Sequence, residues 1–177
     1  MIKFNAKKEQ HIKHVLLLRH AKSSWNQIEL SDFDRPLLEK GLKRSKLMID
    51  YLLGQKVQLD YIVSSPAVRA KATAEIFARG LNFPVEKIRY EKKIYHGDGD
   101  ALFEQFFDIP QFVNTMMIVG HNPSITNFAN YFLDKKIDYL PTSGVVSLGF
   151  KTDRWEKIAT ASRIVNFVVY PKMFRND

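Results

Sequence analysis

The sequence predicts an α/β fold, a three-layer α/β/α sandwich around a mostly parallel sheet. Two runs of strand length, at 14–18 and 115–120, are apolar at almost every position, which is typical of strands buried on both faces of a parallel sheet. Segments with helical character follow these runs, and alternation of strands with helices favours an α/β protein. No internal repeat and no Gly/Ser-rich linker divides the 177 residues, so we expect a single domain over 1–177.

The first half of the chain is expected to contain two strand-and-helix pairs. The strand at 14–18 is followed by a helix over 39–53, which ends at a glycine. A second strand at 60–65 runs directly into Pro66, which suits the first position of a helix. We expect Ser65 to be the N-cap of that helix, which continues through AVRAKATAEIFA.

The second half begins with short elements and ends in strands. A strand is expected at 86–91 and a short helix at 100–107. The strand at 115–120 leads into a helix over 123–133, with Asn122 as its cap. The remaining strand-rich segments are 144–150, 154–158 and 163–170. We expect the last strands to lie antiparallel at one edge of the sheet.

Composition and charge exclude several classes of site. With 45% hydrophobic and 26% charged residues, the chain has the composition of a soluble globular protein. The absence of cysteine excludes disulfides and thiolate metal sites. The net charge of +8 could serve an anionic partner, but no basic run with interleaved aromatic residues indicates nucleic acid. No apolar run approaches the ~20 residues of a membrane span, and no secretory signal is visible, so we expect a cytoplasmic protein without a membrane partner.

Polar side chains stand at the carboxyl ends of three predicted strands, where ligands bind in open α/β sheets. Arg19 and His20 follow the first strand, Arg69 lies in the first turn of the helix after the second, and His121 follows 115–120. If these strands are parallel neighbours, two arginines and two histidines converge. None of them has an acidic neighbour in the sequence, so we expect a strongly positive site. Such a site suits a dianionic phosphoryl group, because guanidinium groups bind phosphate oxygens bidentately.

Each of these residues, taken alone, is more often an ordinary loop or surface residue, and only the repeated pattern favours a functional interpretation. Arg69 adds a second argument. A cation in the first turn of a helix is poorly placed for helix stability, because cations prefer the carboxyl end. We therefore expect the Arg69 guanidinium to bind two phosphoryl oxygens. On this interpretation, a lysine at this position should change fold stability little or even raise it.

Four segments together resemble the histidine phosphatase superfamily, the phosphoglycerate-mutase-like enzymes. RHAKSSWN at 19–26 resembles the first motif of the family, SSPAVRAKATA at 64–74 the second, and VGHNPSI at 119–125 the third. SDFDRPLLEKG at 31–41 is similar to the segment between the first two motifs. The alanine at position 21, the DFDRPL stretch and the small size resemble the branch of bacterial phosphohistidine phosphatases.

This resemblance implies a phosphoglycerate-mutase-like fold and a metal-independent phosphatase without a cofactor. The enzyme would hydrolyse a phosphate monoester or a phosphohistidine through a covalent phosphohistidine on His20. Arg19, Arg69 and His121 would bind the phosphoryl oxygens and stabilise the transition state, and Asn26 would also contact the phosphoryl group. The expected partner is a phosphorylated small molecule or a phosphohistidine protein, and the sequence specifies no oligomeric state.

The larger family uses a general acid, but no motif in this sequence marks a residue for that role. Glu91 and Asp98 lie in the corresponding region, but an exposed structural role is at least as good an interpretation of each, and His96 in the same loop is expected to face solvent. An alkoxide leaving group needs a general acid, whereas imidazole, with a reference pKa of about 6.5, leaves far more easily. The missing acid therefore favours phosphohistidine or another activated phosphate.

Two further segments could contribute to the site, and the sequence leaves three alternative functions open. Arg35 either borders the site or holds its loop by pairing with Asp32 or Asp34, and PTSG at 141–144 could form part of the wall. A phosphomutase is the first alternative, although 177 residues leave little room for the insertions of mutases. A phosphate- or phosphoprotein-binding module without activity is the second. A nucleic-acid-binding protein would rest on the charge alone.

Overall fold

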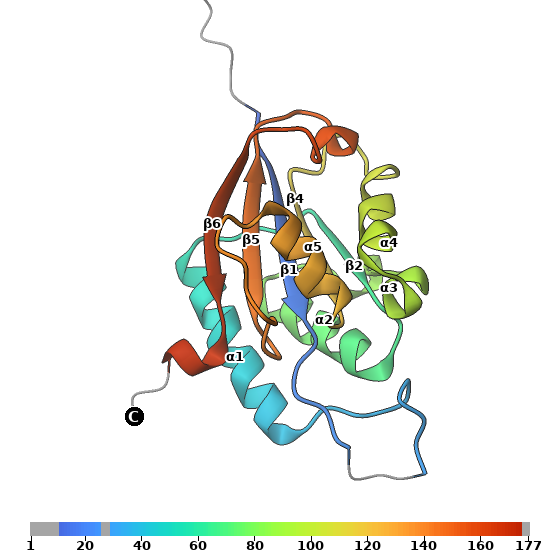
Figure 1. Cartoon of the computed structure of the whole chain (residues 1–177). Coiled ribbons are helices and arrows are strands. Elements are labelled where there is room, and N and C mark those ends of the chain that lie inside the picture. The colour runs from blue at the N-terminus through green and yellow to red at the C-terminus, as the bar shows by residue number, and fades with distance from the viewer. Residues whose placement is uncertain (1–10, 26–28, 175–177) are drawn as a thin grey trace, which may run out of the picture.

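A computed structural model describes residues 11–25 and 29–174, which form one six-stranded sheet with helices on both faces (Figure 1). The strands are β1 (Lys13–Arg19), β2 (Tyr61–Ser64), β3 (Arg89–Tyr90), β4 (Thr115–Gly120), β5 (Val145–Phe150) and β6 (Arg163–Val169). The helices are α1 (Glu39–Gly54), α2 (Val68–Gly80), α3 (Lys93–His96), α4 (Gly99–Phe103) and α5 (Ser124–Phe132). Short 3-10 turns lie at Val85–Lys87, Glu104–Phe106, Trp155–Lys157 and Pro171–Phe174.

The strand order is β3-β2-β4-β1-β5-β6, and the first four of these strands are parallel. Strand β5 is antiparallel to β1, and β6 is antiparallel to β5. The sheet is therefore mostly parallel with antiparallel strands at one edge, as the sequence predicts. Arg19 is paired with Gly120, and Ser64 with Val119, so β1, β2 and β4 end at the same edge of the sheet.

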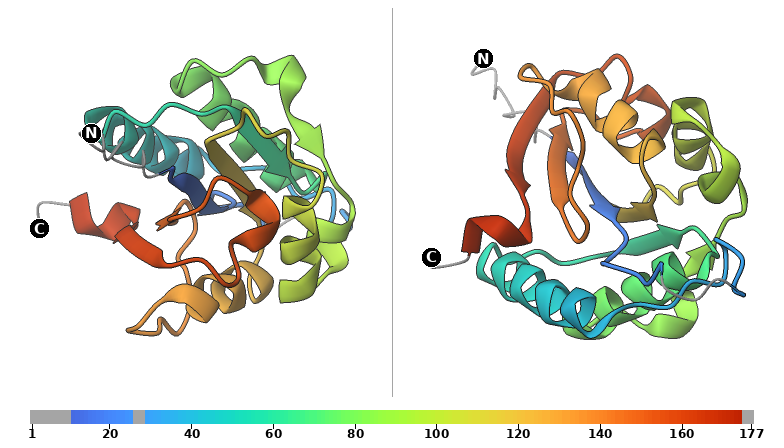
Figure 2. Two further views of the ribbon diagram at one scale, coloured as in Figure 1. Left: turned by 90° about the horizontal axis from the view of Figure 1, so that it is seen from above. Right: turned by 60° about the horizontal axis from the view of Figure 1, so that its bottom comes forward.

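The two faces of the sheet are covered by different helices, which confirms the predicted three layers. Leu16 and Leu18 of β1 pack with α1 and α2, whereas Leu17 between them packs with α4 and α5. Successive side chains of a strand point to opposite faces, so a strand buried on both sides needs apolar residues at consecutive positions. Figure 2 shows α1 and α2 on one side of the sheet and α5 on the other.

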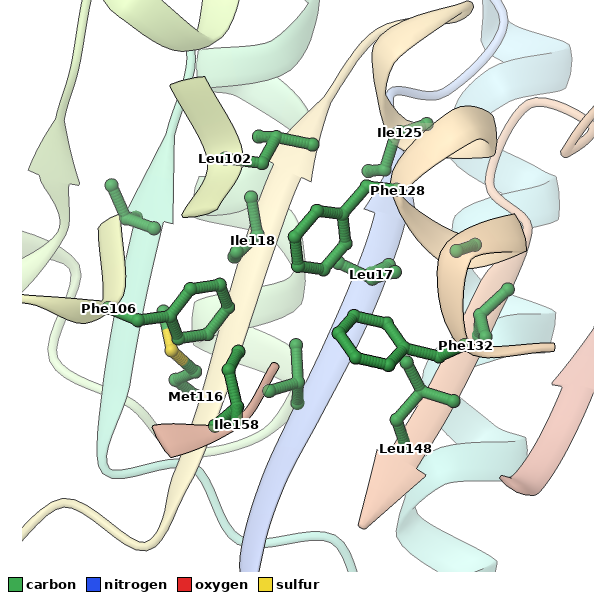
Figure 3. Packing of buried hydrophobic residues seen from close by; sticks show 14 of the residues in the cluster. Leu17, Leu102, Phe106, Met116, Ile118, Ile125, Phe128, Phe132, Leu148 and Ile158 are labelled. Carbon is green, nitrogen blue, oxygen red and sulfur yellow. The ribbon is translucent and has the colours of Figure 1, made fainter. Parts of the chain in front are cut away.

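Aromatic side chains fill the layer between the sheet and α5 (Figure 3). Phe128 packs against Phe103, Phe106 and Phe132, with ring centroids 4.6 to 5.8 Å apart. Trp155 extends this cluster by stacking on Phe106, and its indole Nε1 donates a hydrogen bond of 2.9 Å to the Val113 carbonyl.

No helix in the described part of the chain is both long and apolar enough to cross a membrane.

Several local predictions from the sequence are wrong. The segment 154–158 is a 3-10 turn and not a strand, because Trp155 turns inward to fill the aromatic cluster. The helix after β2 begins at Val68 rather than Pro66, and no side chain caps it. The Ser65 hydroxyl instead lies against His121, at 2.8 Å from its Nε2.

The helix after β4 likewise begins later than expected, at Ser124 behind Pro123, and no side chain caps it. The Asn122 side chain makes two other hydrogen bonds: its nitrogen donates to the Leu140 carbonyl, and its oxygen accepts from the Thr126 hydroxyl. In both cases the expected cap residue makes contacts that its sequence context does not predict: Ser65 with His121, and Asn122 with the Leu140 carbonyl.

We predict that Phe128→Ala lowers the free energy of unfolding by about 3–5 kcal/mol, because a large buried ring leaves a cavity that the packed aromatic cluster cannot close. Phe107→Ala is the matched control, since the Phe107 ring is exposed, and its effect should stay within about 0.5 kcal/mol. Urea unfolding at neutral pH measures both. Equal losses in the two variants would contradict the packing described above.

Candidate active site

The carboxyl ends of β1, β2 and β4 open into a pocket of about 260 Å³. This edge of the sheet is turned toward the reader in the right-hand view of Figure 2. The pocket is lined by Arg19, His20, Lys22, Ser23, Trp25, Asp32, Arg35, Arg69, His121, Asn122 and Thr142. The structure thus brings together the four side chains that the sequence placed at three separate strand ends: Arg19, His20, Arg69 and His121. Asn26, the remaining predicted phosphoryl contact, lies outside the described residues.

The backbone around His20 is held on three sides. The His20 N–H donates to the Gly120 carbonyl of β4 at 3.1 Å, which continues the parallel ladder past the end of β1. The N–H of Ser143 lies 3.1 Å from the Arg19 carbonyl oxygen, so the predicted PTSG segment packs behind the site. The Ala21 N–H donates to the Thr73 hydroxyl of α2 at 2.9 Å. The position of the His20 side chain therefore depends on β4, α2 and the turn before β5.

The His20 ring has one tautomer that satisfies its surroundings. Its Nδ1 lies 2.8 Å from the Ala21 carbonyl oxygen, and a carbonyl can only accept a hydrogen bond. Nδ1 must therefore carry the proton, which leaves the lone pair on Nε2. The carbonyl of the next residue in the chain thus sets the tautomer of the His20 ring.

Both histidines of the pocket are held in the neutral form. The pKa of His20 is lowered to about 3, chiefly by burial and further by His121, Arg69 and Arg19. The pKa of His121 is also lowered to about 3, again chiefly by burial and then by the Arg69 cation. The two rings lie 5.0 Å apart between centroids. A neutral His20 is the form that can act as a nucleophile, because a protonated imidazole has no free lone pair.

His121 can donate a hydrogen bond even though it is neutral. Its Nε2 lies 2.8 Å from the Ser65 hydroxyl oxygen, and its buried Nδ1 has no partner among the described residues. If the Ser65 hydroxyl donates to Nε2, the ring proton is on Nδ1 and is available to a ligand oxygen. Sequence analysis missed this role of Ser65, because a serine before a proline and a helix is the usual signal for a cap.

The two arginines also have buried donors without partners. The Arg19 Nη1 donates to the Leu140 carbonyl at 2.8 Å, but no described group accepts from the Arg19 Nε. The Arg69 Nη2 donates to the Asp32 carboxylate at 2.8 Å and its Nη1 donates to the Asp32 carbonyl, whereas its buried Nε is likewise unpartnered in the described structure. Buried donors without acceptors are costly, so these nitrogens fit an anion in the pocket.

Asp32 corrects the expectation of a strongly positive site, because it pairs with Arg69 although it is not adjacent to it in the sequence. It comes from the loop before α1, 37 positions away from Arg69 in the sequence, and accepts from Arg35 at 2.6 Å and from the Tyr95 hydroxyl at 3.0 Å. Partial burial raises the pKa of Asp32, but the hydrogen bonds from Arg35, Tyr95 and Arg69 outweigh this and bring it to about 2. The site is positive, but Asp32 offsets part of that charge.

Arg35 borders the pocket, and it also holds the loop in place by pairing with Asp32. The structure therefore agrees with both interpretations that the sequence left open. Besides Asp32, its guanidinium donates to the Ser24 carbonyl at 2.7 Å and to the Ser23 hydroxyl at 2.8 Å. The guanidinium carbon also lies 3.3 Å from the ring centroid of Trp25, which is 71% exposed at the rim.

The two candidate general acids lie elsewhere. Glu91 accepts from the Lys93 N–H at 3.1 Å and pairs with Arg89 at 3.3 Å, and Asp98 caps α4 by accepting from Asp100. Neither lines the pocket. His96 is exposed, as expected. Within the described ranges, no three His, Cys, Asp or Glu side chains are grouped to hold a metal ion.

The lowered pKa values predict how stability depends on pH. Between pH 6.5 and 3 the unfolded chain binds protons at His20 and His121 that the folded protein does not bind, so the free energy of unfolding falls as the pH falls. At pH 5, each histidine should lower the free energy of unfolding by on the order of 2 kcal/mol. In His20→Asn, the loss between pH 7 and pH 5 should shrink by about that amount.

Urea unfolding in buffers free of oxyanions measures this, because an anion in the pocket would favour the protonated histidines. His96→Asn is the control, since this histidine is exposed and outside the pocket. A pH dependence that is the same in wild type and in both variants would show that burial of His20 does not control its charge.

Comparison with known proteins agrees with the geometry. Residues 15–98 match the histidine phosphatase superfamily (branch 1). An uncharacterized protein of Mycobacterium leprae is 28% identical over 82% of this chain and 94% of its own length. Phosphohistidine phosphatase SixA of Escherichia coli is 37% identical over 40% of this chain and 42% of SixA.

The fold is also shared with a solved structure. The protein histidine phosphatase SixA, determined in complex with tungstate, matches with a TM-score of 0.74 at 23% identity, over 92% of this chain and 99% of that one. The phosphoglycerate-mutase-like α/β fold expected from the sequence is confirmed. The matching motifs, their convergence on one pocket and the shared fold lead to one conclusion: the chain resembles the histidine phosphatase superfamily, whose match covers residues 15–98, and within it the phosphohistidine phosphatase branch.

Proposed function

We propose that this protein is a phosphatase that hydrolyses an activated phosphate, preferably a phosphohistidine, through a covalent phosphoryl group on His20 and without a metal ion. The observation that carries the proposal is the state of His20, which is neutral, fixed by the Ala21 carbonyl at Nδ1, and in a pocket with the two arginines. The names of the SixA relatives, which are phosphohistidine phosphatases, support the same substrate class.

In the first step the Nε2 lone pair of His20 attacks phosphorus, a bond forms between nitrogen and phosphorus, and the bond to the leaving group breaks. The unpartnered donors of Arg19, Arg69 and His121 bind the phosphoryl oxygens as charge shifts in the transition state. In the second step water attacks phosphorus and His20 leaves. Because the Ala21 carbonyl keeps the proton on Nδ1, His20 departs as neutral imidazole.

The choice of an activated phosphate follows from Asp32. It is the only carboxylate that lines the pocket within the described residues, and its pKa of about 2 means that it is ionised at neutral pH. An ionised carboxylate cannot protonate an alkoxide leaving group. A phosphorylated imidazole needs no such acid, because its other ring nitrogen takes up a proton near neutral pH and the group leaves as neutral imidazole.

Turnover of a chemically phosphorylated histidine peptide in the presence of EDTA tests the proposal. Wild type should release phosphate with the chelator present, since side chains supply the positive charge. His20→Ala should lose turnover by a factor of at least ~10³ while its circular dichroism spectrum stays that of wild type. Full activity in His20→Ala, or loss of wild-type activity that a divalent ion restores, would refute the mechanism.

We predict that Arg69→Lys lowers kcat/KM about 30- to 1000-fold, equivalent to about 2–4 kcal/mol, because lysine keeps the charge but loses the planar set of donors. The sequence-based expectation of unchanged fold stability needs correction. Arg69 is buried and ties α2 to the Asp32 loop, so this variant should also unfold more easily.

Asp32→Asn separates these two effects, because it breaks the same ion pair and leaves the Arg69 guanidinium in place. Its loss of stability should resemble that of Arg69→Lys, while its kcat/KM stays within about tenfold of wild type. If the two variants lose kcat/KM equally, Arg69 acts through its structural contact with Asp32 and not through the phosphoryl group.

A further inference from the structure

A second groove adjoins the active-site pocket and shares Thr142 with it. It encloses about 500 Å³, nearly twice the volume of the pocket itself. Its lining includes the side chains of Arg44, Lys136, Tyr139, Tyr170 and Lys172, and we call it the Arg44 groove. A phosphoryl group alone occupies only the pocket, so this neighbouring space is available to another part of a larger substrate.

Arg44 of α1 shares one structural feature with the two arginines of the pocket. Its Nε is buried and has no hydrogen-bond partner among the described residues, as is true of the Nε of Arg19 and of Arg69. A buried guanidinium nitrogen without an acceptor lowers stability unless an anion or another acceptor meets it. The Arg44 side chain also lines the groove, so an anionic group bound there lies close to its guanidinium.

The charge around the two hollows is strongly unbalanced. Seven cationic side chains line them: Arg19, Lys22, Arg35, Arg44, Arg69, Lys136 and Lys172. Only two carboxylates do so in the described structure, Asp32 in the pocket and Asp138 in the groove. The Lys136 ammonium donates to the Asn130 and Leu133 carbonyls, and no described carboxylate pairs with Arg44, Lys136 or Lys172.

Large exposed aromatic rings flank this positive surface. Tyr139 is 63% exposed in the groove, and Trp25 is 71% exposed at the rim of the pocket. Rings with one apolar face and one polar edge are enriched where proteins bind other proteins. Together with the positive charge, they favour a polypeptide with acidic side chains over a small phosphate ester.

We propose that the Arg44 groove binds an acidic segment of a phosphorylated protein substrate, a few residues away from the phosphorylated side chain in the pocket. This inference rests on the proposed phosphatase function for the choice of a phosphorylated substrate, whereas the preference for an acidic segment rests on the groove alone. The groove sets which phosphoproteins are selected, and the pocket performs the reaction.

Binding tests the groove without any need for turnover. The probe is a fluorescein-labelled, unphosphorylated peptide with four Asp or Glu residues, compared with the same peptide carrying Asn or Gln at those positions. Wild type should bind the acidic peptide about tenfold more tightly, and Arg44→Glu and Lys172→Glu should each weaken that binding about three- to tenfold. Lys46→Glu is the matched control, because it reverses a charge at an exposed position of the same helix outside the groove.

Equal binding of both peptides, or equal weakening by Lys46→Glu, would overturn the proposal. A single-stranded oligonucleotide of the same charge that binds more tightly than the acidic peptide, and loses that binding in Arg44→Glu, would assign the groove to nucleic acid instead.

Turnover separates a failure of the groove from a failure of the proposed function. Arg44→Glu should raise KM for a phosphohistidine peptide with acidic flanks and leave kcat unchanged, with no effect on free phosphoimidazole. If wild type hydrolyses neither substrate but still prefers the acidic peptide in binding, the phosphatase function fails and the groove stands. If hydrolysis is normal but indifferent to acidic flanks in wild type, the groove proposal fails and the phosphatase function stands.

Discussion

The hydrogen bond between the His20 Nδ1 and the Ala21 carbonyl, at 2.8 Å, is the contact on which the chemistry of the site depends. It fixes the tautomer, so that the lone pair lies on Nε2, and in the proposed mechanism it keeps a proton on Nδ1 throughout the two steps. The carbonyl itself is held in place because the Ala21 N–H is bound to Thr73 of α2. A local contact between neighbouring residues thus depends on the packing of a helix against the sheet.

The cost of this arrangement is a pocket with more positive charge than its own residues can offset. Burial and the two arginines keep both histidines neutral, and three ring or guanidinium nitrogens of the site lack partners within the described residues. The single carboxylate of Asp32 is shared between one edge of the Arg69 guanidinium and Arg35. An anion with two negative charges relieves this imbalance better than a singly charged one, so the same feature that lowers stability supports the proposal of a dianionic phosphoryl group.

The sequence predicted the sheet, its two helical layers and the meeting of Arg19, His20, Arg69 and His121, because parallel neighbouring strands must end at one edge. It could not predict Asp32 as the partner of Arg69, since that contact depends on the path of a loop 37 positions away in the chain. It also misjudged Ser65 and Asn122, because a polar residue before Pro in front of a helix is an ordinary cap signal, and only the fold shows that other groups bind these side chains. The sequence pattern places Trp155 in a strand, because hydrophobicity alone does not distinguish a strand from a buried turn.

The central claim is that the phosphoryl group passes through His20, and direct detection of that intermediate tests it most closely. Wild-type protein mixed with a phosphohistidine peptide in excess is quenched in alkali within the first turnover, digested and analysed by mass spectrometry, because phosphate on histidine survives alkali and is lost in acid. The account predicts alkali-stable phosphate on the peptide that contains His20, in an amount approaching one per protein and absent from His20→Ala. Phosphate on another residue, or release of phosphate during the first turnover by His20→Ala at the wild-type rate, would contradict it.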